Sequence, residues 1–417
     1  MKDKNFDIVN QKMDARALNK TARRIGAFML LAGGMLPLSL PAQDANSIKN
    51  QLIQQGFENV GVMENDSVRT FVIQPTQYNV VPDGVKEAIR LIDANTTTRS
   101  KKTNLIILEN NVPQLSVSQQ PGNGAWTASN ELGISLSELN QIKKENRSYG
   151  KIDLVFYPEF YFRNIRLSVM YEVLLNLNPT IEVSLWKGMK FTGQLVLPII
   201  NEYGYLYEKV RPGIVTLSQS FRLPYRTNLT LTAGFFSDFR HGFSAYAEHY
   251  LPRNAWGQFW LDARLDWTKY GRFDGWVYKH ADGSMVTGQL GVNYYWKRHN
   301  TQLSLRGHRF LQGEYGVRFQ AIRHFRIVSI GLYATKIQKM PKYGHHGYDA
   351  GFMFALNFPP RKSKRHGYWP RLQAGDMSLR YSAGGDKRYG FSFMTAPDDN
   401  LWHKVNNNSE FIQSYIN

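Results

Sequence analysis

The second half of this chain alternates apolar and polar side chains residue by residue over segments of strand length. In residues 289–296 the even positions are Leu, Val, Tyr and Trp, whereas the odd positions are Gln, Gly, Asn and Tyr. Residues 261–268 repeat the pattern with Asp262, Arg264 and Asp266 on the polar face. Successive side chains of a strand point to opposite sides, so one face can meet hydrocarbon while the other meets water or a plug. A soluble β-sandwich also alternates, and alternation alone does not separate the two folds.

Strand length favours the membrane interpretation. Several of the expected strands reach ten residues, the length that a tilted strand needs to cross a bilayer, whereas soluble strands average five or six. Turn signals include Asn178-Pro179 and the segment from Asp238 to Gly242. Unpaired backbone groups are costly in hydrocarbon, so a spanning sheet must close. We therefore predict a transmembrane antiparallel β-barrel of about twelve strands. The expected ranges are 151–164, 166–177, 180–199, 212–223, 228–239, 243–252, 256–270, 285–297, 301–312, 316–325, 327–338, 347–358 and 372–383, with a further segment near 388–395.

Composition agrees with a barrel and excludes some chemistry. Aromatic residues make up 13% of the chain, which is typical of a barrel with aromatic girdles at both membrane interfaces. There is no cysteine, so disulfides and thiolate sites are excluded. The net charge is +18. In an exported protein such a charge points to anionic headgroups or acidic polysaccharide rather than nucleic acid, although a basic surface without a specific ligand is an alternative.

The N-terminus resembles an export signal. Lys20, Arg23 and Arg24 precede an apolar run from Ile25 to Leu40, and small residues follow. This pattern predicts a signal peptide over residues 1–42, with a membrane anchor as the alternative. An exported protein that folds as a β-barrel is expected in the outer membrane of a Gram-negative bacterium.

The mature chain divides into four expected parts. Residues 43–125 combine helical and strand patterns and predict a small periplasmic α+β module. Residues 126–150 are expected to be a linker, residues 151–397 the barrel and residues 398–417 a polar C-terminal tail. Many outer-membrane barrels end on a strand with a terminal aromatic residue, and this chain does not. Either an internal signal near 390–393 replaces it, or the tail folds back.

Three stretches of the sequence resemble the YjbH family of exopolysaccharide-associated outer-membrane proteins. They are residues 52–60 with the segments that follow them up to Val117, residues 250–258, and residues 346–352. The resemblance implies an outer-membrane barrel with periplasmic α/β elements that aids secretion or assembly of an extracellular polysaccharide, beside outer-membrane lipoproteins and other export components. Larger relatives carry more strands and repeated modules, which puts a wide polymer-conducting pore in doubt here. The family supplies no catalytic residues.

The polar face of the barrel provides the candidate binding residues. Charged side chains of mixed sign can contact sugar hydroxyls and carboxylates, and an aromatic ring can stack on a sugar. The alternative is that they pair with one another and fill the lumen. The lumen-lining candidates for glycan contact are Asp262, Arg264, Asp266, Tyr295, Arg306, His308, Arg318 and Arg380.

A basic loop before Tyr368 is the densest run of positive charge. It can bind lipopolysaccharide phosphates or an acidic glycan at the barrel rim, or it is a solvated loop. Its candidate residues are Arg361, Lys362, Lys364 and Arg365.

No residue pattern predicts a metal site, a cofactor or a catalytic centre. The histidines lack the helical spacing of a zinc motif, and the pair His345-His346 falls in a glycine-rich turn. The pairs His241 with Ser244 and Ser304 with His308 are the nearest to a hydrolase or acyltransferase dyad. We therefore expect a non-enzymatic protein that aids export or assembly of an extracellular or capsular polysaccharide. A general diffusion porin, a structural scaffold of a surface assembly and a lipid-modifying enzyme are the alternatives.

Overall fold

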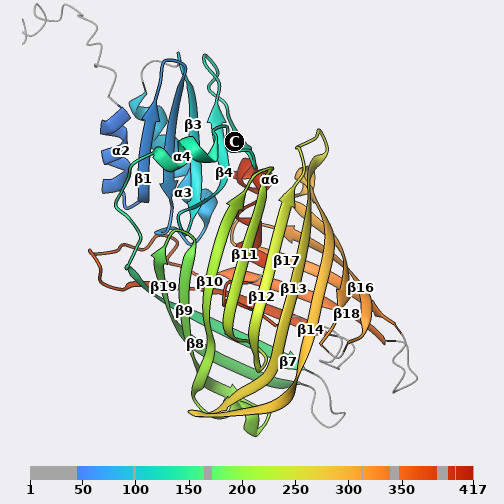
Figure 1. The fold of residues 1–417 in the computed structure, drawn as a ribbon. Helices are drawn as coiled ribbons and strands as arrows, with labels where there is room; N and C mark the ends of the chain where they lie inside the picture. Colours follow the sequence, from blue (N-terminus) through green and yellow to red (C-terminus); the bar gives the residue numbers. More distant parts are fainter. Residues whose placement is uncertain are drawn as a thin grey trace, which may run out of the picture. The chain divides into compact units, whose positions relative to one another are not determined.

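The computed structural model describes residues 45–96, 100–163, 171–311, 313–338, 347–382, 393–399 and 401–416. The expected signal peptide, residues 1–42, lies outside the described residues. Within the described ranges the chain is mainly β, with one sheet of six strands and one of fourteen (Figure 1). The prediction of a mainly β, barrel-like fold is thus confirmed.

The six-stranded sheet occupies the N-terminal part of the described chain. Its strand order is β5-β4-β3-β2-β1-β6. Strands β2 and β3 are parallel and flank helix α3, which gives a βαβ unit, and the other neighbours are antiparallel. The elements are α2 (Ala45–Gln54), β1 (Glu58–Glu64), β2 (Val68–Gln74), α3 (Val81–Asn95), β3 (Lys102–Glu109), β4 (Val112–Gln119), β5 (Trp126–Ser129), α4 (Leu136–Gln141) and β6 (Lys144–Glu145).

Apolar side chains cover both faces of this sheet. On one face, Ile48 of α2 and Ile92 of α3 pack with Phe71 and Leu105 in a buried cluster. On the other face, Val72 and Ile106 pack against Leu139 of α4. The segment 126–150, expected to be a linker, therefore holds β5, α4 and β6. The reason is that Trp126, Leu139 and Ile142 are apolar anchors set in polar sequence, and such short elements have no periodicity of their own.

The fourteen-stranded sheet begins with long antiparallel strands in sequence order from β7 to β18. Figure 1 shows them curving into a barrel-like wall. The strands are β7 (Ile152–Arg163), β8 (Glu172–Trp186), β9 (Met189–Asn201), β10 (Arg211–Leu223), β11 (Thr227–Phe236), β12 (Arg240–Tyr250), β13 (Gly257–Asp274), β14 (Val277–Trp296), β15 (Thr301–Arg309), β16 (Tyr315–His324), β17 (Val328–Ile337), β18 (Gly347–Asn357), β19 (Arg371–Ala374) and β20 (Asp376–Ser382), and two 3-10 turns, η1 (Tyr205–Tyr207) and η2 (Lys297–His299), lie between strands.

The two ends of this sheet meet through β19 and β20, which are separated only by Gly375. Strand β20 pairs with β18 in antiparallel register, and β19 pairs with β7 in parallel register. The parallel contact follows from strand number, because after twelve strands of alternating direction the chain runs the same way as β7. At this seam the guanidinium of Arg371 donates to both carboxylate oxygens of Asp153 at 3.0 Å.

One expected turn is wrong. Asn178 and Pro179 lie inside β8, where they pair with Tyr157 and Phe156 of β7, and the turn comes instead at Lys187 and Gly188. Pro179 faces outward and forms part of the apolar alternation of β8, which outweighs the tendency of Asn-Pro to begin a turn. The last expected strand, near 388–395, falls mainly outside the described residues.

The C-terminal residues fold back on the rest of the chain. Two helices, α5 (Leu401–Val405) and α6 (Ser409–Ile416), occupy most of the range expected to be a polar tail. Ile412 of α6 joins the core of the six-stranded sheet, and Phe411 packs in a second cluster with Tyr250 and Tyr295 of the large sheet. Of the two possibilities that the sequence left open, this arrangement is the folded-back tail.

Candidate functional site

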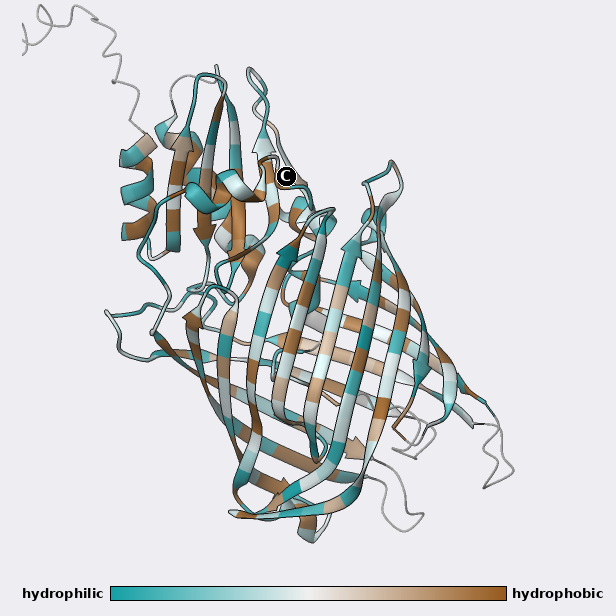
Figure 2. Cartoon of the chain, viewed as in Figure 1, coloured by the Kyte–Doolittle hydropathy of each residue, from teal (hydrophilic) through white to brown (hydrophobic). Residues whose placement is uncertain are grey.

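The wall of the large sheet is apolar outside and polar inside. Leu265 is 62% exposed and Leu290 is 68% exposed, whereas Asp262 and Asp266 are 1% and 4% exposed. Figure 2 shows the same alternation of hydrophobic and hydrophilic residues along the strands. This distribution is the inverse of a soluble sheet, which buries its apolar face and exposes its charges. The predicted alternation, with apolar side chains on one face of the sheet and polar side chains on the other, is therefore present in the fold.

The lumenal carboxylate of Asp262 is surrounded by donors. It accepts hydrogen bonds from Arg306 Nε at 2.8 Å, Gln289 Nε2 at 3.0 Å and Asn293 Nδ2 at 3.1 Å. Arg306 also contacts Gln320 and donates to Asn293 Oδ1 at 2.7 Å. A buried charge is tolerable only with such partners. The network therefore stiffens one wall of the lumen. This matches the alternative in which the lumenal charges pair with one another.

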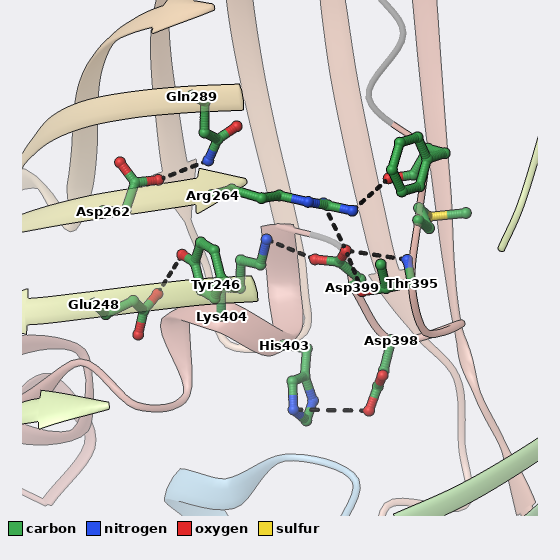
Figure 3. A network of polar contacts seen from close by, with 12 residues as sticks. Tyr246, Glu248, Asp262, Arg264, Gln289, Thr395, Asp398, Asp399, His403 and Lys404 are labelled. Atoms are coloured by element: carbon green, nitrogen blue, oxygen red, sulfur yellow. Dashed lines mark hydrogen bonds and ion pairs between the residues drawn. The ribbon is translucent and has the colours of Figure 1, made fainter. Parts of the chain in front are cut away.

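A second network surrounds Arg264 and includes the C-terminal segment, defined here as residues 393–399 and 401–416. Arg264 forms an ion pair with Asp266 at 2.8 Å. It forms a second ion pair with Asp399 of this segment at 3.3 Å (Figure 3). Its guanidinium lies 4.8 Å from the centre of the Phe393 ring. Lys404 reaches Asp399 at 2.6 Å. Asp399 thus holds two cations, one from the barrel wall and one from α5.

Further contacts follow the C-terminal segment across the lumen. Phe393 stacks on Phe236 of β11, with ring centres 5.2 Å apart. Asp398 pairs with Lys190 of β9 at 3.2 Å. Helix α5 also contacts β17 and β18, which lie elsewhere in the order of the sheet. The segment is therefore a plug fastened to several parts of the wall.

The plug separates two cavities. One has a volume of about 300 Å³ and the other of about 360 Å³. Arg264, Asp399 and Lys404 line both of them, so this triad forms part of the partition. The first cavity is lined by many aromatic rings, which are Tyr161, Phe162, Tyr203, Tyr207, Phe235, Phe236, Phe239, Phe273, Tyr333, Phe354 and Phe393.

The structure brings five of the lumenal candidates to the first cavity: Asp262, Arg264, Arg306, His308 and Arg318. His308 stacks on Phe310 with ring centres 5.1 Å apart. Arg318 donates to Thr335 Oγ1 at 2.9 Å and lies 5.2 Å from the centre of the Tyr333 ring.

The other lumenal candidates lie elsewhere. Asp266 accepts from Thr287 at 2.9 Å and lines neither cavity. Tyr295 is fully buried in the cluster beneath α6 and stacks on His324, so it packs rather than facing a cavity. The backbone of Arg380 pairs with Met353, and its side chain lies outside the described part of the chain.

Two of the four candidate side chains of the basic loop contact other parts of the chain, and two are exposed. Arg365 forms ion pairs with Asp153 of β7 and, at 3.0 Å, with Glu58 of β1. Lys362 lies 5.2 Å from the centre of the Tyr78 ring and donates to Gln55. The side chains of Arg361 and Lys364 are exposed. Two of the four rim candidates thus connect the loop to the six-stranded sheet, because they find acceptors there.

The side-chain pairs considered for hydrolase chemistry do not form dyads. His241 and Ser244 are three residues apart on β12 and point to opposite faces. Ser304 and His308 share a face but stand about 13 Å apart along β15, at 3.3 Å per residue. Within the described ranges, no group of three or more His, Asp or Glu residues is arranged to hold a metal ion. His345 and His346 lie outside these ranges.

Sequence reasoning missed the residues of the plug. Asp398, Asp399, His403 and Lys404 all fall in the range 398–417, which was predicted to be a polar tail without a role. The available signal was two adjacent acidic residues followed, five positions later, by two adjacent basic ones. Nothing local indicated that their partners are Lys190 and Arg264, far away in the chain.

No helix among the described residues is both long enough and apolar enough to cross a membrane. Comparisons with protein-family models, with curated proteins and with solved structures found no match. The resemblance to the YjbH family therefore stays a prediction.

Proposed function

We propose that the protein is a non-enzymatic β-barrel of the bacterial outer membrane that aids export or assembly of an extracellular or capsular polysaccharide. The observation that carries the membrane part is the inverted wall, with exposed leucines outside and buried carboxylates inside. In water, so much contiguous apolar surface is an aggregation liability. In a bilayer it is the normal exterior of a barrel.

Exposed aromatic residues at both ends of the strands support the same proposal. At the end where β8 turns into β9, the exposed rings include Trp186, Tyr225 and Trp256. At the opposite end they include Trp276 and Tyr348. Amphipathic rings favour the headgroup level, and two such girdles enclose the apolar band of a membrane barrel. On this proposal the six-stranded sheet lies in the periplasm.

The chemistry of the first cavity supports a carbohydrate ligand. Its aromatic wall offers flat apolar surfaces that suit the C–H faces of sugar rings. Arg211 is buried there, lies 5.6 Å from the centre of the Tyr207 ring and donates to the carbonyls of Tyr207 and Lys209. Arginine binds carboxylates in bidentate fashion, so an acidic sugar fits this cavity better than a neutral one.

The plug distinguishes this proposal from a general diffusion porin. A porin keeps a wide aqueous lumen, whereas here the Arg264, Asp399 and Lys404 triad divides the lumen in two. We infer a resting state that is closed and that opens when the C-terminal segment moves. The scaffold alternative shares the closed lumen, and it differs by requiring no movement of the plug.

Two measurements test the proposal separately. Fractionation of cells that express the full chain should place it in the outer-membrane fraction, resistant to extraction by alkaline carbonate. Deletion of the gene should reduce surface polysaccharide, and restoration of the gene should recover it. Recovery of the folded protein in the aqueous fraction would overturn the membrane part. An unchanged surface coat would overturn the polysaccharide part and leave the barrel intact.

A further inference from the structure

The outer wall carries a groove across β14, β15, β16 and β17, with a volume of about 790 Å³. One row of paired residues crosses it in the order Leu290, Gly307, Val317 and Lys336. The next row holds Gly288, Arg309 and Tyr315. Gly288 and Gly307 have no side chains to fill the surface, and a Cβ on Gly307 would have no neighbour closer than 4.0 Å. The glycines therefore create the groove.

Two cations border the groove. Arg309 lies 5.9 Å from the centre of the Tyr315 ring, and Lys336 lies 5.9 Å from the centre of the Tyr348 ring. Both are exposed, and neither forms an ion pair with any carboxylate in the described part of the chain. They stand two strands apart and two residues apart along the strands, which is about 12 Å between their Cα atoms at the usual spacings. One phosphate group with its ester oxygens can therefore reach both side chains.

We propose that this groove is a binding site for an anionic phosphorylated lipid. An acyl chain lies over Gly307 between Leu290 and Val317, and the phosphate lies between Arg309 and Lys336. The ligand must be amphipathic, because the lining is almost wholly apolar apart from these cations. A soluble anion would leave the apolar floor uncovered, and a lipid without net negative charge, such as zwitterionic phosphatidylcholine, would leave the cations unmatched. The inference rests on the proposed function to the extent that this wall must face lipid.

The experiment uses the purified full chain inserted in nanodiscs of phosphatidylcholine. An anionic phosphorylated lipid, either lipid A or phosphatidylglycerol, is added, and the lipid retained by the protein is measured by native mass spectrometry. We expect selective retention of the added lipid over phosphatidylcholine. Each of R309Q and K336Q should weaken retention about fivefold, since one basic side chain near an anionic lipid surface contributes about that factor.

Two further variants separate the site from general surface charge. Lys269 lies 5.6 Å from the centre of the Trp267 ring on β13, outside the groove, so K269Q removes a similar cation and should leave retention unchanged. G307L fills the groove without changing charge and should reduce retention. Retention of lipid A alone, or of both added lipids, supports the site. The comparison also identifies which lipid supplies the phosphate.

Defined outcomes overturn the inference. Equal retention of zwitterionic phosphatidylcholine and the anionic lipids would do so, as would loss of retention in K269Q equal to that in R309Q. In both cases insertion into nanodiscs would still support the membrane part of the proposed function. A chain that folds in buffer and never enters nanodiscs would overturn both together.

Discussion

The Nε2 atom of His403 lies 2.6 Å from Oε1 of Glu109, which joins helix α5 of the plug to strand β3 of the six-stranded sheet. Burial alone would lower the pKa of His403, but the charges of Asp398 and Glu109 outweigh it and raise the pKa to about 10. Burial would raise the pKa of Glu109, but His403 and the amide of Asn407 lower it to about 2. The two side chains thus form an ion pair at neutral pH.

This pair predicts how stability depends on pH. The His403 pKa is raised above 6.5, so its contribution is complete below pH 6.5 and is lost as the pH rises through about 10. The Glu109 pKa is lowered below 4.5, so its contribution is complete above pH 4.5 and is lost as the pH falls through about 2. Urea unfolding of the full chain in lipid vesicles should therefore show this interaction at its strongest between pH 4.5 and 6.5.

The variant H403Q should reduce the free energy of unfolding by up to about 1 kcal/mol at pH 6, because the pair is only partly buried. At pH 10 its effect should be close to zero. H366Q, in an exposed loop, serves as the control and should change neither value. An equal loss in H403Q at pH 6 and pH 10 would show that the ion pair is not the cause.

Removal of the Asp399 carboxylate should open the lumen. In D399A the buried guanidinium of Arg264 loses one of its two carboxylate partners and Lys404 loses its partner, at a cost of about 3 kcal/mol to the seated plug. The displaced state should then be populated about a hundredfold more. Planar-bilayer recordings should show rare openings for the natural sequence and frequent openings for D399A, whereas D282A in the exposed β14 segment should match the natural sequence.

A disulfide crosslink between the barrel wall and the plug should prevent the openings that D399A is expected to cause. Thr216 Oγ1 of β10 donates to the carbonyl of Thr395 at 3.3 Å, and the chain has no cysteine of its own. In the triple variant T216C/T395C/D399A, oxidation should suppress the openings and reduction should restore them. Openings that persist after verified disulfide formation would mean that current does not pass the plug.

The seam of the barrel should be sensitive to one added methyl group. A Cβ on Gly375 would lie 2.3 Å from Cδ1 of Tyr157 of β7. G375A should therefore reduce the free energy of unfolding by about 1–3 kcal/mol. In a Y157A background the cost should shrink, because the clashing ring is gone. If the two effects were simply additive, Tyr157 would not be the obstacle at the seam.

The barrel was predictable because its signal is local. Each strand carries its own alternation, so Asp262 and Leu265 could be assigned to opposite faces without knowledge of any partner strand. The core of the six-stranded sheet was also accessible through the helical spacing of Val85, Ala88 and Ile92.

The plug and the roles of the candidates were not predictable, because they depend on contacts between distant residues. Asp399 meets Arg264 across 135 positions, and no periodicity encodes such a pair. Tyr295 looked like a lumenal ring by parity, yet α6 covers it. Arg365 looked like a free rim cation, yet Asp153 and Glu58 bind it. The odd or even position of a residue along a strand predicts which face of the sheet its side chain lies on. It does not predict which other residues contact that side chain.

The most direct measurement of the central claim is the unfolding free energy of L265R in lipid vesicles. Leu265 is 62% exposed on the outer wall. If this wall faces hydrocarbon, an arginine there should cost about 2–4 kcal/mol. If the wall faced water, the same substitution at an exposed site would change stability by no more than about 0.5 kcal/mol. A loss in the first range is what we predict, and a change within the second would contradict a membrane barrel.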